Sequence, residues 1–466
     1  MQTINSSSGG SSTAIIEQPA SPHIRMDTQR SMTIPEDPPT SPQPPLEDFE
    51  PHLQKWNSPR INIWRCVGTF WSFVILGAND AAIGALIPYL EEWYNVNYTI
   101  ISLVFLSPIV GYTLSALLNN HIHVVYGQRG VAFIMSLSHL LGYGVLEPDP
   151  NSFDRNAWIG DMADANEVLG FLHGFYGVGA ALSPLIATTV VTQAGWKWYE
   201  FYYILVGGAA IEVMVLVGTF WKADAQAFRT QRLTTAEAEI STELDSAPRE
   251  TQEQSTLKKL NPFGKREKGK SKTIEAVKNR VTILASLFLL AYVGVEVSIG
   301  GWIVTFMLRV RKGSPFASGM TSTGFWLGIT VGRFLLGFVT GRLFPSEKWA
   351  VTTYLACSVG LQLLFWLIPN FYVSSVMIGF LGFFLGPMFP AAVVALTKLL
   401  PKKLHVTAVG FACAFGASGA TVFPFAVGAI ANAAGVKVLQ PIVLAALVLC
   451  VVVWLLIPRL PKQRMA

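Results

Sequence analysis

The sequence has few charged side chains for its length. Asp, Glu, Lys and Arg make up 14% of the 466 residues, against about 25% in an ordinary soluble domain. Of the 63 charged residues (34 basic and 29 acidic), 11 lie in 1–60 and 22 lie in 222–280, which leaves 30 for the other 347 residues. Two long stretches are therefore almost free of charge, and we interpret them as parts of a membrane protein.

Cysteine is also scarce, and several chemical motifs are missing. The four cysteines lie in apolar stretches without the spacing of a disulfide framework or a zinc site. No phosphate-binding loop of the G-x-x-x-x-G-K-[ST] type occurs, which disfavours an ATP-driven pump. We therefore expect no enzyme activity and no cofactor or metal. The net charge of +5 comes from a basic central loop, so it bears on membrane orientation rather than on nucleic acid.

Apolar runs fill the two uncharged stretches. Most have about 20 residues, which is the length that a helix needs to cross a bilayer, whereas a spanning strand needs only about 9–11. The sequence thus predicts an all-α polytopic membrane protein with eleven spans, five before the central loop and six after it. The predicted spans are 63–87, 99–118, 130–146, 167–191, 200–221, 280–308, 319–341, 349–368, 372–397, 405–431 and 437–457.

The polar stretches complete the predicted domain organisation. Residues 1–62 are rich in serine and proline and have no apolar signal-peptide core, so we expect a disordered tail and a first span that acts as the targeting signal. A helical bundle follows at 63–221, then a basic loop at 222–279. A six-helix bundle at 280–458 and a short tail at 459–466 complete the chain.

Lys and Arg in the short loops predict the orientation. Basic residues precede the first span, while the next loop, 91–97, has acidic residues and no basic one. The N-terminus is therefore predicted to be cytoplasmic, and the 13 basic residues of 222–280 place the central loop on the same side. Arg309, Arg311 and Lys312 count against this orientation. A cytoplasmic tail and a cytoplasmic loop require an even number of spans between them, yet only five are found.

The arrangement resembles the major facilitator superfamily, and particular strings resemble its fucose permease-like branch, including fungal members. The strings of that branch are Asn79-Asp80 in the first span, Tyr292-Val293-Gly294-Val295-Glu296, Gly332-Arg333-Phe334 and Gly386-Pro387-Met388-Phe389-Pro390. Gly127-Gln128-Arg129-Gly130 is similar to the end of the superfamily's loop after span two, although Asn119 or Asn120 replaces the usual Asp. The resemblance covers about 63–221 and 280–458, and it is based mainly on the order of the motifs along the chain. It implies a fold of two helical bundles and a secondary transporter of a small polar solute.

The chain departs from this pattern near 147–156. Asn156-Ala157-Trp158-Ile159-Gly160 resembles the end of the family's fourth span, but an acidic, proline-broken segment replaces the residues before it. Such a segment cannot cross hydrocarbon. Our hypothesis is a splice variant or gene model that has lost about 20–25 residues, the length of one spanning helix. An uninterrupted reading frame between the codons for Leu146 and Asn156, with no intron candidate, would refute it.

Ionisable side chains inside the spans are the functional candidates, because a charge at membrane depth costs about 2.5–3.5 kcal/mol on insertion scales. Asp80 lies mid-span among small residues, with Asn79 beside it, and Glu296 lies mid-span after the central loop. A buried carboxylate can hold a proton near neutral pH. We expect Asp80 and Glu296 to bind protons or substrate hydroxyls, with a structural hydrogen bond as the alternative. For Glu212 we expect a bond between helices.

Other candidates could line the path of a solute. His173 and Tyr176 lie in a glycine-rich stretch and are expected at a cavity. Arg333 lies in a ladder of glycines over 324–341, which predicts close helix packing, and it needs an anionic or carbonyl partner, for which the two carboxylates are candidates. Three tryptophans could stack on a sugar or pack between helices: Trp158, Trp302 and Trp326.

Together these features predict a multi-pass protein of the plasma membrane or an internal membrane that works by alternating access. Its partners would be a small solute, protons and the bilayer. The resemblance implies that the solute is a monosaccharide moved with a proton. The alternative is a membrane protein that does not transport, either a nutrient sensor or an inactive variant.

Overall fold

The computed structural model describes residues 55–145, 165–223, 225–226, 274–344, 346–401 and 404–458. Most of the predicted N-terminal tail and central loop, the tail at 459–466 and the segment at 147–156 lie outside these residues. Within the described residues every named element is a helix, and nine helices or helix pairs are long and apolar enough to cross a membrane. The all-α prediction is confirmed.

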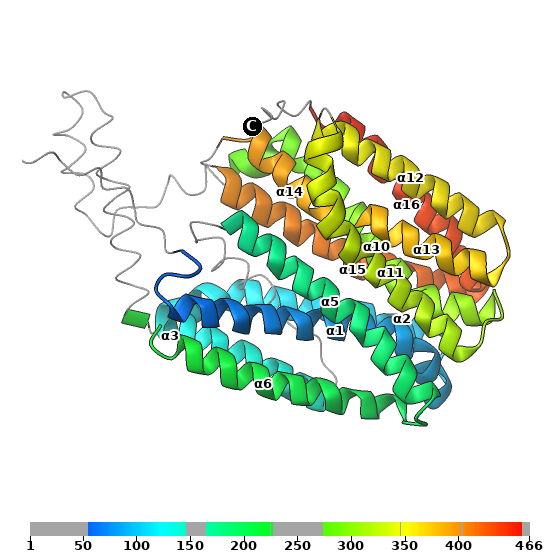
Figure 1. The fold of residues 1–466 in the computed structure, drawn as a ribbon, viewed down its shortest axis with the longest axis horizontal. Coiled ribbons are helices and arrows are strands. Elements are labelled where there is room, and N and C mark those ends of the chain that lie inside the picture. Colours follow the sequence, from blue (N-terminus) through cyan, green and yellow to red (C-terminus); the bar gives the residue numbers. More distant parts are fainter. Residues whose placement is uncertain are drawn as a thin grey trace, which may run out of the picture. The chain divides into compact units, whose positions relative to one another are not determined.

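The first half contains the helices before the central loop. They are α1 (Ile61–Tyr94), α2 (Tyr98–Ser102), η1 (Leu103–Phe105), α3 (Ser107–Val145), α5 (Ala165–Thr192), η2 (Trp198–Phe201) and α6 (Tyr202–Phe220). The predicted spans 99–118 and 130–146 fall on α2, η1 and α3. Helix α3 breaks at Gly127, where φ is 70°, a conformation that glycine adopts without steric cost. Figure 1 shows α1 and α5 lying side by side.

The second half contains the helices after the loop. They are α10 (Arg280–Arg309), α11 (Pro315–Leu343), α12 (Glu347–Leu367), α13 (Phe371–Leu385), α14 (Met388–Leu399), α15 (His405–Ala434), η4 (Val436–Val438) and α16 (Leu439–Leu456). The predicted span 372–397 is a helix pair that meets at Gly386 and Pro387, because proline cannot donate the backbone hydrogen bond that would continue the first helix.

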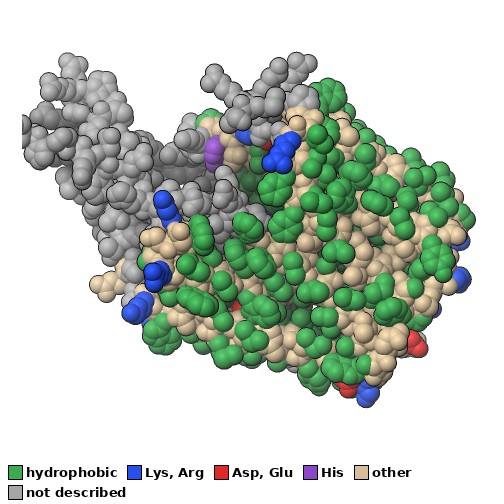
Figure 2. Space-filling model, viewed as in Figure 1, with side chains coloured by type: hydrophobic (Ala, Val, Ile, Leu, Met, Phe, Trp, Pro, Cys, Tyr) green, Lys and Arg blue, Asp and Glu red, His purple; other side chains and the backbone are tan. Residues whose placement is uncertain are grey.

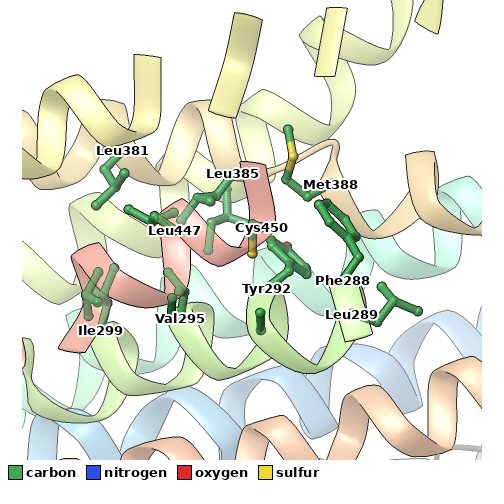
Figure 3. Close-up of a cluster of buried hydrophobic side chains, with 14 of the residues drawn as sticks. Phe288, Leu289, Tyr292, Val295, Ile299, Leu381, Leu385, Met388, Leu447 and Cys450 are labelled. Carbon is green, nitrogen blue, oxygen red and sulfur yellow. The ribbon is translucent and has the colours of Figure 1, made fainter. Parts of the chain in front are cut away.

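Helix α10 lies at the centre of the second half. Its buried side chains, among them Phe288, Val295 and Ile299, pack in one cluster with Leu385 of α13 and Cys450 of α16 (Figure 3). Helix α10 packs on α15 and α16 in the same way that α1 packs on α5 and α6. The two halves are therefore built alike.

The glycine ladder lets α11 and α13 approach closely, as predicted. A Cβ atom at Gly332 would lie 1.9 Å from the carbonyl oxygen of Phe383, and one at Gly382 would lie 2.2 Å from that of Phe325. Both distances are far below van der Waals contact, so a larger residue at either position would push the helices apart.

Contacts at the helix ends fix the direction of each helix in the first half. The Arg65 Nε near the start of α1 donates to the carbonyl of Thr219 near the end of α6, at 3.2 Å. At the opposite end, Trp93 of α1 meets Tyr199, which follows α5, with ring centroids 5.9 Å apart. Helix α1 thus starts where α6 ends. We call this the predicted cytoplasmic end, and the other the predicted external end.

The surface between these ends is apolar. Figure 2 shows hydrophobic side chains over the middle of the visible face, with most of the Lys, Arg, Asp and Glu side chains near the two ends of the helices. Large apolar side chains are among the most exposed, for example Phe338 at 69% and Leu367 at 71%. Soluble proteins rarely expose such continuous apolar surface, so this band is suited to contact with lipid.

Candidate functional site

Asp80 and Tyr176 form a bonded pair in the first half. Asp80 lies about midway along α1, and its side chain is exposed although both of its chain neighbours are buried. The phenol of Tyr176 on α5 donates to its Oδ2 at 3.0 Å, and the Asn79 amide lies 3.5 Å from Oδ1. The predicted candidates Asp80, Asn79 and Tyr176 therefore come together at one place.

Glu296 and Arg333 form the matching pair in the second half. The Arg333 Nη2 of α11 donates to Oε1 of Glu296 on α10 at 3.2 Å, and the side chains are 11% and 8% exposed. Of the two carboxylates considered as partners for Arg333, the structure selects Glu296. Because a buried charge without a partner would be costly, each side chain supplies the partner that the other needs.

Arg333 also connects the two halves. Its Nη1 donates to the backbone carbonyl of His173 on α5 at 3.4 Å, and its Nε donates to that of Gly386 at 3.3 Å. The His173 ring lies 5.5 Å from Phe389 in the second half. Tyr176 is close enough to Glu296 and Arg333 to interact electrostatically with both. The two bonded pairs thus belong to one connected site between the halves.

Tyr292 belongs to this site, although the sequence analysis did not single it out. It is fully buried on α10 and interacts electrostatically with Glu296 and Arg333. Its position four residues before Glu296 puts both on the same helix face. That spacing could have identified it from the sequence.

The predicted stacking tryptophans lie in packed surroundings. Trp302 is fully buried, donates from Nε1 to the Pro424 carbonyl at 2.8 Å, and meets the Tyr98 ring edge-on at 5.7 Å. Trp326 is 3% exposed and packs against Phe325. This packing favours the structural alternative for both. Trp158 lies outside the described residues.

Glu212 makes the expected bond between helices. Its Oε2 lies 2.7 Å from Nδ1 of His139 on α3, and its Oε1 accepts from the Ser72 hydroxyl of α1. Glu212 and His139 are both buried. This cluster ties together three helices of the first half.

The two halves meet closely toward the predicted external end. A Cβ atom at Gly84 of α1 would lie 1.9 Å from the carbonyl oxygen of Gly300 of α10. Beyond this contact, Arg309 lies 3.7 Å from Glu91. At the predicted external end, α1 and α10 are therefore in direct contact.

Two of the three basic residues that opposed the predicted orientation have local partners. Arg309 pairs with Glu91. Arg311 donates to the carbonyl of Phe365 at 2.6 Å and to Ser374 at 2.9 Å, so it binds at the end of α12, where a positive charge is favourable. Burial lowers the pKa of the Arg311 guanidinium. These contacts give two of the basic residues a structural role at the predicted external end.

The fold is that of a polytopic helical membrane protein. A family model described as the Major Facilitator Superfamily matches residues 284–466. The yeast Saccharomyces cerevisiae protein named Bypass of stop codon protein 6 is 27% identical over 418 residues, which cover 84% of this chain and 81% of that protein.

Solved structures give the same result for the fold. A D-xylose-proton symporter superposes with a TM-score of 0.59, and the E. coli fucose:proton symporter with 0.51. Each is 11% identical in sequence and covers 86% of this chain, with 98% of its own chain covered. The chain thus has the fold of these solved structures and is an integral, multi-pass membrane protein.

Proposed function

We propose that this protein is a transporter of the major facilitator superfamily, which moves a small neutral polar solute of the monosaccharide class together with a proton, by alternating access. The observation that carries the proposal is the meeting of Asp80 with Tyr176, and of Glu296 with Arg333, at one site between the halves. The symporter names of the two solved structures agree with this choice. The cytoplasmic placement of the N-terminus and the assignment to the fucose permease-like branch are parts of the same proposal.

The proton binds at Asp80. Its carboxylate is accessible and accepts a bond from Tyr176. Protonation removes the negative charge, and a hydrogen bond to a neutral acceptor is about half as strong as one to an ionised acceptor. Tyr176 is then freer to turn toward Glu296 and Arg333, with which it already interacts. Proton uptake in the first half thereby alters the contact with the second half.

A neutral solute fits the charges of the second pair. The charges of Glu296 and Arg333 offset each other across a 3.2 Å contact, so the pair does not favour an ion of either sign. Carboxylate oxygens and guanidinium N–H groups are an acceptor and a donor for hydroxyls. A hydroxyl-rich molecule can therefore replace part of the contact between the pair, and part of the link from Arg333 to His173.

Accumulation in proteoliposomes tests the proposal. With an inward proton gradient, the reconstituted chain should concentrate D-xylose or fucose, whereas Asp80→Asn should only equilibrate it. The exposed Glu92→Gln at the end of α1 is the matched control and should behave as the parent chain does. If Asp80→Asn still concentrates solute against a gradient, Asp80 is not the coupling site.

The second candidate is a membrane protein that does not transport, such as a nutrient sensor or an inactive variant. The observation that favours it is the acidic, proline-broken sequence at 147–156, where the family pattern has a span. Protease cleavage of the central loop from the cytoplasmic side separates the correctly inserted protein from a misassembled one, because only correct insertion places that loop there. Binding of a tested sugar without its transport, in a correctly inserted protein, would favour the sensor over the transporter.

A further inference from the structure

Trp326 of α11 has a buried N–H group without an acceptor among the described residues. The side chain is 3% exposed, and its Nε1 makes no hydrogen bond in this part of the chain. Trp302 and Trp454 are also buried, yet each donates from Nε1 to a backbone carbonyl, at 2.8 and 3.1 Å. Because buried polar groups in proteins are nearly always paired, the N–H of Trp326 needs an explanation.

Trp198 shares this feature but lies elsewhere. Its Nε1 is also buried without an acceptor in the described part of the chain. Trp198 begins η2 at the predicted external end, where its ring meets that of Tyr94. Trp326 lies in the middle of α11, seven residues or about two turns before Arg333. Of these two tryptophans, Trp326 is therefore the one at the central site.

The indole nitrogen of Trp326 lies against the face of α10 that carries Glu296. A Cβ atom at Gly300 would lie 3.3 Å from Nε1, and Gly300 follows Glu296 by four residues, which puts both on one face of the helix. Cα–Cβ bonds tilt toward the start of a helix, so this Cβ position is on the side of Gly300 nearer to Glu296. The two residues are about 6 Å apart along the axis of α10.

The face of α11 that carries Trp326 is directed toward the first half. Trp326, Thr330 and Arg333 are spaced by four and three residues, so they share one face. The Thr330 hydroxyl would lie 2.5 Å from a Cβ atom at Gly177 of α5, and Arg333 donates to the His173 carbonyl of the same helix. Trp326 is the member of this face nearest to the predicted external end.

Trp326 also lies at the level where α1 and α10 cross. Gly300 contacts the indole ring on one side, and its carbonyl oxygen faces Gly84 of α1. Gly84 follows Asp80 by four residues, as Gly300 follows Glu296, so each carboxylate is about one turn from the crossing. A molecule held between the carboxylates and the crossing would therefore meet the N–H group of Trp326.

An indole N–H completes the hydrogen-bonding groups of this site. Asp80 and Glu296 offer acceptors, and each nitrogen of Arg333 already donates to an acceptor. A hydroxyl both donates and accepts, so one that donates to Glu296 needs a donor for its own oxygen, and an indole N–H can only donate. Because the indole is neutral, it leaves the charge balance between Glu296 and Arg333 unchanged.

We propose that Trp326 binds the solute through its indole N–H, by donating to a hydroxyl that also donates to Glu296. The proposal rests on the proposed function, because the solute is then a hydroxyl-rich molecule of the monosaccharide class. This contact differs from stacking, since the ring packs against Phe325 and the nitrogen edge makes the bond. Trp326 thereby selects solutes that have a hydroxyl at this position.

Uptake kinetics in proteoliposomes test the proposal. Trp326→Phe keeps an aromatic ring and removes the N–H, so the KM for whichever of D-xylose and fucose the parent chain transports should rise about tenfold, as expected for one lost hydrogen bond. Trp302→Phe is the matched control and should leave the KM unchanged, because its N–H bonds to Pro424. An unchanged KM in Trp326→Phe would overturn the proposal.

Monodeoxy analogues of the same sugar identify the hydroxyl. The analogue that lacks the hydroxyl bound by Trp326 should compete less well than the sugar for uptake by the parent chain. That loss should be about tenfold smaller in Trp326→Phe, because the two changes remove the same bond. Equal losses in both chains for every monodeoxy analogue would contradict the proposal.

Thermal unfolding without solute tests whether the N–H is unpaired in the fold. Trp302→Phe removes a hydrogen bond to Pro424, whereas Trp326→Phe removes an N–H without an acceptor, and both lose the same side-chain volume. The midpoint of unfolding should therefore fall further for Trp302→Phe. An equal or larger fall for Trp326→Phe would show that its N–H has an acceptor within the protein, and would overturn the proposal.

The outcomes separate this proposal from the proposed function. A parent chain that transports neither sugar contradicts the proposed function, and the solute contact of Trp326 with it. Transport by the parent chain with an unchanged KM in Trp326→Phe contradicts the contact of Trp326 alone.

Discussion

The buried bond between Glu212 and His139 allows a sharp prediction about stability. Glu212 is wholly buried, lies 2.7 Å from Nδ1 of His139 and accepts from Ser72. Glu212→Leu leaves both partners without their acceptor, and breaking a buried pair in this way costs about 3–5 kcal/mol. Glu212→Gln keeps the shape and can still bond both partners, so we expect a loss of about 1 kcal/mol.

The free energy of unfolding, measured by denaturant titration in mixed micelles, separates these outcomes. A background with Ser72→Ala and His139→Leu supplies the control, because Glu212 then has neither partner. In that background, Glu212→Leu should lower the free energy of unfolding by about 0.5–3 kcal/mol less than it does in the parent chain. This range is the usual coupling energy between residues in contact. If Glu212→Leu and Glu212→Gln lowered the free energy of unfolding equally in the parent chain, the bonds from Glu212 to Ser72 and His139 would not be the source of the stability.

Three further predictions concern the predicted external end. Gly84→Val should separate α1 from α10, because even its Cβ would lie 1.9 Å from the Gly300 carbonyl; solute uptake should fall at least tenfold, and normal uptake would contradict the close contact. Arg309→Gln should lower the free energy of unfolding by less than about 1 kcal/mol, since the pair with Glu91 is half exposed on the arginine side; a larger loss in denaturant titration would be inconsistent with that exposure. Arg311→Ala removes charged hydrogen bonds to the end of α12 and should lower the free energy of unfolding by about 1.5–3 kcal/mol in the same titration. An unchanged free energy of unfolding would show that this contact does not stabilise the fold.

The central charges could be found from the sequence because of their cost in a membrane. Asp80 and Glu296 stand out from apolar surroundings, and Arg333 requires a partner that the spans can supply. The choice between the carboxylates could not be made from sequence, because it depends on how α10 and α11 pack. The contact between Arg333 and the His173 carbonyl was likewise hidden, since any backbone carbonyl can accept such a bond.

The all-α character and the order of the helices could be predicted for similar reasons, whereas the breaks within the helices were harder to predict. Eleven spans were predicted, and nine helices or helix pairs within the described residues are long and apolar enough to cross a membrane. The pair Gly386 and Pro387 splits one predicted span into two helices, and that signal was present in the sequence. The packing role of Trp302 depends on the Pro424 carbonyl, 122 positions away, which no local pattern reveals. Charge parity, by contrast, indicated a missing crossing from the sequence alone.

Proton movement with the solute is the most direct test of the proposed coupling at Asp80. A pH indicator inside proteoliposomes reports the protons that enter when D-xylose or fucose is added outside, without an imposed gradient. The coupling predicts acidification of the lumen in the parent chain, and solute entry without acidification in Asp80→Asn. Equal acidification in both would contradict the assignment of the proton site to Asp80.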